Sequence, residues 1–163
     1  MTYNGITNLR SLIVSTYLKD NDAKCQNTIE LLSNVSKFCN GIVSFDLWIG
    51  GLTNTFIKPF SNIIKLYPLE RMKMSIRNVE GRAVKDFLHA LEFRSETLKE
   101  LLLLKDLNFQ GIDLSFLLDM EYLEHFEFEY CSSFTSKHSE ALFEKKFRLR
   151  KSKLWFYDSE FEH

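Results

Sequence analysis

The chain has little proline and glycine and no surplus of either charge. Its 163 residues include 2 prolines and 6 glycines, and 21 basic residues are balanced by 22 acidic ones, for a net charge of −1. So few Pro and Gly residues argue against a disordered or linker-rich chain. A chain of this length can bury most of its apolar surface in one domain. Because the basic footprint that a phosphate backbone requires is missing, we expect no nucleic-acid partner.

Cysteines and long apolar runs are also scarce. Cys25, Cys39 and Cys131 are odd in number and widely spaced, and no C-x-x-C pair is present to suggest a zinc ribbon or a thioredoxin-type site. Such cysteine usage suits a reducing compartment better than a secreted one. No run of about 18 apolar residues could span a bilayer, and no apolar signal-peptide core is present. We therefore expect no membrane contact and a cytoplasmic or nuclear location.

Patterns typical of catalysis are missing as well. No serine lies in G-x-S-x-G, and the glycines form no phosphate-binding loop. His89, His125, His138 and His163 include no pair at the H-x-x-x-H spacing of a helical metal site, so we expect packing or surface roles for them. The cysteines are expected to act as small buried apolar groups. The sequence thus predicts no enzyme, no metal and no cofactor, with a scattered site of distant residues as a remote alternative.

What the chain does contain is an apolar pattern, L-x-x-L-x-L, that occurs five times. The copies begin at residues 9, 42, 69, 98 and 123, in steps of 33, 27, 29 and 25 residues. A period in this range is typical of a stacked array, in which each unit is too small to bury its own apolar face. The copies are Leu9-Leu12-Val14, Ile42-Phe45-Leu47, Leu69-Met72-Met74, Leu98-Leu101-Leu103 and Leu123-Phe126-Phe128.

Each copy predicts a short strand, because apolar and polar residues alternate within it, most clearly over residues 121–130. Between the strands, apolar spacings of three and four predict helices, with Asn21 and Asp22 as candidate caps of the first. A strand, a helix and a parallel strand form a right-handed crossover. The sequence therefore predicts a curved α/β solenoid with strands on the inner wall, although an ordinary α/β domain would also contain such elements. The predicted helical segments are 29–38, 57–67, 84–91 and 114–118.

Two cysteines occupy places that point to a particular repeat. Cys131 is at the ninth position of the copy that begins at Leu123, and Cys39 lies just before the strand predicted at Ile42. In these features the chain resembles leucine-rich-repeat proteins of the cysteine-containing subtype found in F-box substrate receptors. The resemblance covers about residues 5 to 135. The other four copies depart from it, because their ninth positions are neither Cys nor Asn: Tyr17, Gly50, Arg77 and Asp106.

The resemblance implies an α/β leucine-rich-repeat solenoid of about five repeats over residues 1–135. Residues 136–163 would be a degenerate last repeat or a C-terminal tail, and a docking segment in that tail is a further alternative. The implied function is recognition of a protein or peptide substrate for a ubiquitin ligase of the Skp1–cullin–F-box type. No segment resembles an F-box, so contact with Skp1 or cullin would need a missing module. The alternative is a scaffold or inhibitor of the same shape, unrelated to ubiquitin.

The residues between the core positions of each strand are expected to line the open inner wall, because side chains alternate across a strand. Exposed Trp48, Leu102 and Leu104 would each forgo roughly 1.5–3 kcal/mol of burial. An apolar patch with charged residues around it suits a protein partner, unless these residues pack on a neighbouring loop or the register is shifted. The predicted partner-binding residues are Asp46, Trp48, Arg71, Lys73, Glu100, Leu102, Leu104, His125, Glu127 and Glu129.

Neighbouring parallel strands also predict how these residues are grouped. One row across the sheet would contain Asp46, Lys73, Leu102 and Glu127. The next row would contain Trp48 and Leu104 with Ser75 between them. In this scheme Trp48 is the aromatic anchor, the two leucines are the apolar floor, and the charged residues orient the partner.

Overall fold

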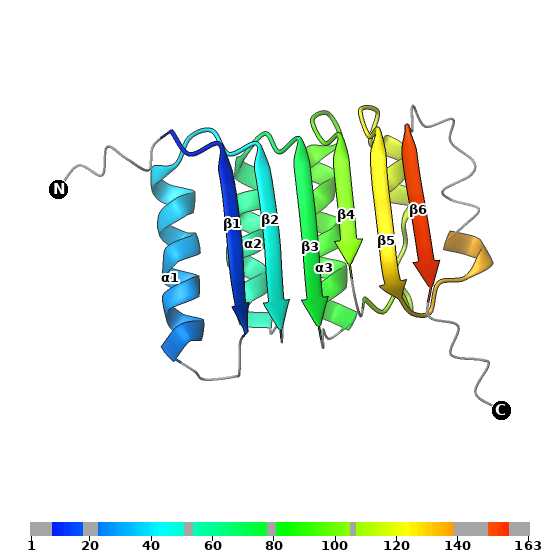
Figure 1. The fold of residues 1–163 in the computed structure, drawn as a ribbon, viewed down its shortest axis with the longest axis horizontal. Helices are drawn as coiled ribbons and strands as arrows, with labels where there is room; N and C mark the ends of the chain where they lie inside the picture. The colour runs from blue at the N-terminus through cyan, green and yellow to red at the C-terminus, as the bar shows by residue number, and fades with distance from the viewer. Residues whose placement is uncertain are drawn as a thin grey trace.

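A computed structural model of the chain describes residues 8–17, 23–50, 54–77, 81–104, 107–138 and 150–156. Within these ranges, six strands form one sheet in which all neighbours are parallel and the strand order follows the chain (Figure 1). The predicted α/β class is therefore confirmed. The strands are β1 (Ser11–Tyr17), β2 (Ser44–Gly50), β3 (Arg71–Arg77), β4 (Glu100–Leu104), β5 (His125–Cys131) and β6 (Lys151–Phe156).

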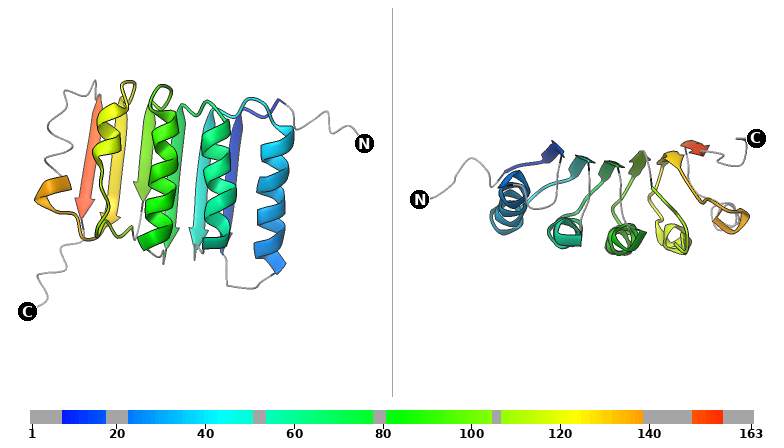
Figure 2. Two further views of the ribbon diagram at one scale, coloured as in Figure 1. Left: turned by 180° about the vertical axis from the view of Figure 1, so that it is seen from behind. Right: turned by 90° about the horizontal axis from the view of Figure 1, so that it is seen from below.

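The helical segments lie together on one face of this sheet. Figure 2 shows strands in one layer and helices in the other, with the helices on the outer side of a shallow arc. Successive crossovers on the same face move the chain steadily along the sheet, which is compatible with a solenoid-like arrangement. The other face of the sheet carries no helix among the described residues (Figure 1). The segments are α1 (Ala23–Phe38), α2 (Asn54–Leu66), α3 (Gly81–Leu91) and two 3₁₀ helices, η1 (Glu92–Arg94) and η2 (Ser115–Asp119).

The register of the sheet aligns the apolar pattern of the sequence. The last apolar residue of each L-x-x-L-x-L copy, its sixth position, is paired with that of the next copy across the sheet, from Val14 in β1 to Phe128 in β5. The five predicted strands are therefore confirmed, and they occupy equivalent places. The fourth positions are also neighbours, in the order Leu12, Phe45, Met72, Leu101 and Phe126.

The same pair of backbone hydrogen bonds recurs at the entry to each of the strands β2 to β6. One carbonyl accepts the N–H groups of two consecutive residues in the following unit, at N···O distances of 2.8 to 3.2 Å. These bonds satisfy main-chain donors at the point where each turn meets the sheet. The accepting carbonyls belong to Arg10, Val43, Glu70, Lys99 and Glu124.

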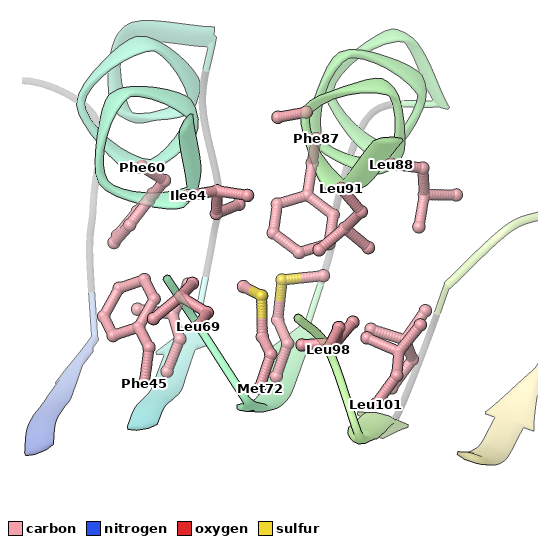
Figure 3. Packing of buried hydrophobic residues seen from close by; sticks show 14 of the residues in the cluster. Phe45, Phe60, Ile64, Leu69, Met72, Phe87, Leu88, Leu91, Leu98 and Leu101 are labelled. Atoms are coloured by element: carbon pink, nitrogen blue, oxygen red, sulfur yellow. The ribbon is translucent and has the colours of Figure 1, made fainter. Parts of the chain in front are cut away.

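The core lies between the sheet and the helices. Phe60 and Ile64 of α2 point toward Phe45 of β2 and toward Leu69 (Figure 3), and all four side chains are at most 1% exposed. The Phe45 and Phe60 ring centroids are 5.9 Å apart. Burial of each such side chain contributes roughly 1.5–3 kcal/mol, so each helix is held mainly by its apolar face. The arrangement repeats under α3, where the labelled side chains are Phe87, Leu88, Leu91, Met72, Leu98 and Leu101.

The first predicted helix is correct in its position but wrong at one residue. Phe38, which belongs to the apolar series that predicted this helix, is 48% exposed, whereas Cys39 is 4% exposed. Steps of three fall short of the 3.6 residues in a helical turn, so the series Leu32, Val35, Phe38 drifts off the core face. Cys39, seven residues after Leu32, returns to it. The candidate caps at 21 and 22 lie outside the described residues.

Polar side chains connect two of the units to the ones before them. The Tyr67 hydroxyl donates to the Val35 carbonyl near the end of α1, at 2.6 Å. The Arg94 guanidinium donates to the carbonyls of Tyr67 at 2.8 Å and Lys65 at 2.9 Å, near the end of α2. The last carbonyls of a helix have no partner within the helix. The Val35 and Tyr67 carbonyls also accept the N–H groups of Cys39 and Leu69, at 3.0 and 2.8 Å. The side chain from the following unit therefore adds a second hydrogen bond at these carbonyls, which stabilises the stacking of units.

The last part of the chain is described only in two pieces. Residues 136–138 are helical, and residues 151–156 form β6, which pairs with β5 with an irregularity between Glu129 and Cys131. Residues 139–149, between these two pieces, lie outside the described residues. The His138 ring accepts the Thr135 N–H at 2.9 Å and contacts the Ile112 carbonyl at 2.8 Å. This short helical turn is therefore hydrogen-bonded to the preceding unit through His138.

Candidate functional site

The face of the sheet opposite the helices, here called the open face, presents the strand residues that alternate with the core positions. The ten residues predicted for partner binding all belong to it. Their burial differs widely: the Arg71 side chain is 47% exposed, whereas Glu127 is 8% exposed. The described side chains of the open face are Ser11, Ile13, Ser15, Ser44, Asp46, Trp48, Arg71, Lys73, Ser75, Glu100, Leu102, Leu104, His125, Glu127, Glu129, Lys151 and Lys153.

These residues form three rows that run across the strands. The row that begins at Ser11 leads through Ser44, Arg71, Glu100 and His125 to Lys151. The predicted row of Asp46, Lys73, Leu102 and Glu127 is confirmed, with Ile13 before it and Lys153 after it. The predicted neighbours Trp48, Ser75 and Leu104 are also confirmed, with Ser15 before them and Glu129 after them. The register of the sheet is therefore not shifted.

The two leucines of β4 are not exposed, so the expectation of an exposed leucine floor was wrong. Leu102 and Leu104 are each 9% exposed. Leu102 is flanked in register by Lys73 and Glu127, whose long aliphatic stems can cover an apolar neighbour in the middle of a wide sheet. The exposed apolar groups of this face lie nearer its other end, namely Trp48 at 37% and Ile13 at 66%.

An ion network occupies the end of the open face formed by β5 and β6. Lys153 Nζ donates to Glu127 Oε1 at 3.1 Å and also to a Glu129 carboxylate oxygen. Burial alone would raise the pKa of Glu127, but hydrogen bonds involving Glu129 and Lys153 outweigh it, so this pKa lies below its ordinary range. The same bonds from Glu129 and Glu127 raise the pKa of Lys153. His125 Nε2 lies 3.5 Å from Glu127 Oε2. The two carboxylates of this end, Glu127 and Glu129, are thus already engaged within the chain.

The sequence did not predict Lys153 as part of this face. Its strand carries Ser152 at the position where the earlier copies have an apolar fourth residue. Leu149 and Leu154 do keep the first and sixth positions of the pattern. A degenerate last repeat was one of the two predictions for residues 136–163, and β6 is compatible with it. Its register was not predicted, so the two lysines Lys151 and Lys153 were not assigned to the open face.

At the end of the open face formed by β1, β2 and β3, the charged residues are arranged differently. Arg71 Nε lies 3.2 Å from Glu100 Oε2, in a pair exposed to solvent. Lys73 Nζ lies 4.9 Å from the centroid of the Trp48 ring, a cation–π contact. Among the described residues, Asp46 Oδ1 is buried and has no hydrogen-bond partner. This end combines exposed apolar surface with polar groups that are not fully paired.

The other described cysteine and histidine residues considered in the sequence analysis are buried or make contacts within the chain. Burial raises the pKa of the Cys39 thiol, which disfavours the reactive thiolate. His89 Nδ1 lies 2.8 Å from Glu92 on the helix side. Both ring nitrogens of His138 have partners, although this ring borders an open hollow of about 550 Å³ that is also lined by Gln110 and Asp113. No single hollow found in the described residues brings His125 together with a serine or cysteine.

The described residues contain no metal-binding cluster and no membrane-spanning helix. In that part of the chain, no group of three or more His, Cys, Asp or Glu side chains could hold a metal ion. No helix there combines the length and apolarity needed to cross a membrane.

Comparison with protein-family models, with the curated proteins and with the solved structures found no match for this chain.

Proposed function

We propose that this chain is a leucine-rich-repeat solenoid of about five units that binds a protein partner on its open strand face. The observation that carries the proposal is the exposure of Trp48 and Ile13 on a sheet face that no helix of the described residues covers. An exposed Trp is costly for a face that serves only to contact water. Tryptophan is also the residue type most enriched among the energetic centres of protein interfaces.

The even geometry of the sheet supports binding of an extended surface rather than a small molecule. Three rows of side chains run across six parallel strands in register. Such a surface is long and shallow, whereas small-molecule sites are concave and bury most of their ligand. Three hollows of the described residues lie elsewhere: beside His138, between α2 and α3, and between α3 and η2. A protein or peptide is therefore the class of partner that fits best.

The proposed cellular context is substrate recognition for a ubiquitin ligase of the Skp1–cullin–F-box type. It rests on the resemblance of Leu123–Cys131 and Cys39 to the cysteine-containing repeats of F-box receptors. The alternative, a scaffold or inhibitor without a link to ubiquitin, uses the same open face. Binding of purified Skp1 to the chain, with and without the sequence encoded upstream of Met1, separates these two contexts. Failure of Skp1 to bind in either form would contradict the ligase context and leave the binding face untouched.

Site-specific photo-cross-linking tests the open face directly. A benzoyl-phenylalanine at Ser44, on the open face, is expected to cross-link a partner protein in cells. The matched control has the same group at Lys85, an exposed residue of α3 on the opposite side. The partner would be identified by mass spectrometry and its binding repeated with purified proteins. Cross-links from Lys85 with none from Ser44 would overturn the proposal.

A further inference from the structure

Lys73 lies between two neighbours that could each hold its charge. In the sheet register it is paired with Asp46 of the adjacent strand. Its ammonium nevertheless lies over the Trp48 ring, 4.9 Å from the centroid, and no ion pair of Lys73 with a carboxylate is found among the described residues. Although Lys73 is directly beside the Asp46 carboxylate, its ammonium therefore contacts the face of the Trp48 ring instead.

Asp46 provides the second position for that charge. In the described part of the chain its Oδ1 atom is removed from solvent and accepts no hydrogen bond. A buried carboxylate oxygen without a donor is costly. Neighbouring strands are only about 4.8 Å apart, so the long Lys73 side chain can reach either Trp48 or Asp46. The cost of leaving Trp48 would be offset by the hydrogen bond that Asp46 lacks.

We propose that Lys73 is a movable cover on Trp48, and that the uncovered ring receives an aromatic or long aliphatic side chain of the partner protein. This inference rests on the proposed function, since it identifies the docking point on the open face and the chemistry of the group that docks. On binding, the Lys73 ammonium moves from the Trp48 ring to the Asp46 carboxylate. The exposed ring is thus protected from water in the unbound protein.

The surroundings of Trp48 favour an uncharged occupant. Its two neighbours in the same row are the small residues Ser15 and Ser75, which leave room beside the ring. Ile13, 66% exposed, is a diagonal neighbour on β1. Once Lys73 pairs with Asp46, no unpaired charge in these two rows borders the ring. A charged group placed there would lose its hydration without gaining a partner, whereas an apolar side chain would extend the contact between Ile13 and Trp48.

Selection from a phage library of random dodecapeptides tests this site even though the natural partner is not identified. Peptides enriched on the full chain are expected to share one aromatic or long aliphatic residue. Replacing Trp48 by Ala is expected to weaken their binding about tenfold or more. Asp46→Asn, which gives the displaced lysine a weaker acceptor, is expected to weaken it a few-fold. The matched control is Phe93→Ala, because Phe93 forms a similar contact with Lys65, at 4.7 Å, on the helix side.

A second variant distinguishes failure of this inference from failure of the proposed function. Lys151→Glu changes the open face at its far end, in β6. Peptides that lose affinity for Lys151→Glu and not for Trp48→Ala would overturn the Trp48 site while the open face remained a binding surface. Peptides insensitive to both variants, or no enrichment over an unrelated immobilised protein, would count against both proposals. Thermal unfolding of each variant excludes loss of the fold as the cause.

The position of Lys73 is measured by NMR on the same samples. In the unbound protein, the methylene protons nearest the Lys73 ammonium should be shifted upfield by the Trp48 ring current, and Trp48→Ala should abolish that shift. Addition of a selected peptide should also abolish it. A shift that persists at saturating peptide would contradict the movement of Lys73.

Discussion

The two ends of the open face use similar residue types in opposite ways. At the β5–β6 end, Lys153 holds both Glu127 and Glu129, and the neighbouring Leu102 of β4 is buried. At the β1–β3 end, Ile13 and Trp48 are exposed, and an oxygen of Asp46 has no donor among the described residues. The carboxylates of the first end are paired within the chain, although His125 Nε2 is buried there without a hydrogen-bond partner in the described part of the chain, while the other end has exposed apolar groups available to a partner. Composition alone does not reveal this difference, because both ends contain charged and apolar residues.

The largest effect that separates the two ends is expected from apolar truncation. Leu102→Ala should lower the free energy of unfolding by about 2–3 kcal/mol, because it removes a buried apolar side chain from between Lys73 and Glu127. Ile13→Ala, at the exposed end, should change it by less than about 0.5 kcal/mol. Urea unfolding of both variants measures the contrast. Equal losses in the two variants would show that the ends do not differ in packing.

A smaller effect on stability is expected from removing the side-chain hydrogen bonds that connect neighbouring units. Tyr67→Phe removes the donor to the Val35 carbonyl and should lower the free energy of unfolding by about 1–2 kcal/mol. The exposed Tyr122 provides the control, since Tyr122→Phe should be neutral within about 0.5 kcal/mol. Chemical denaturation again gives both values. An unchanged stability of Tyr67→Phe would mean that the Cys39 N–H, which also donates to the Val35 carbonyl, is sufficient at this helix end.

The ion network predicts a pH dependence that belongs to the β5–β6 end. The pKa of Glu127 is lowered in the folded chain, so its stabilising contribution is complete above the ordinary Glu pKa and is lost as the pH falls through the lowered value. The pKa of Lys153 is raised, so its contribution is present below the ordinary Lys pKa and is lost as the pH rises through the raised value.

Variants at these two positions check this dependence. Glu127→Gln should flatten the acid side of a plot of thermal unfolding midpoint against pH. Lys153→Met should flatten both the acid and the alkaline side, because it removes one partner from each titration. Profiles of the two variants that run parallel to that of the parent chain would refute the assignment of the network.

The sequence predicted the strands and their order well, because the L-x-x-L-x-L pattern records which side chains face the helices. The rows of the open face followed from that register, since Asp46 and Lys73 must then be neighbours. Exposure was harder to predict, because alternation assigns Leu102 to a face but does not say that Lys73 and Glu127 flank it. The choice of Lys73 between Trp48 and Asp46 depends on side-chain geometry that a linear pattern does not contain. Ser152 interrupted the pattern in β6, so Lys153 was missed.

The most direct test of the open face as a binding surface is the affinity of a purified partner identified by cross-linking from Ser44. The account predicts that Trp48→Ala raises the Kd about tenfold or more, while Phe93→Ala, on the helix side, leaves it unchanged. An unchanged Kd for Trp48→Ala together with a raised Kd for Phe93→Ala would contradict it, because the partner would then bind the helices and not the strands.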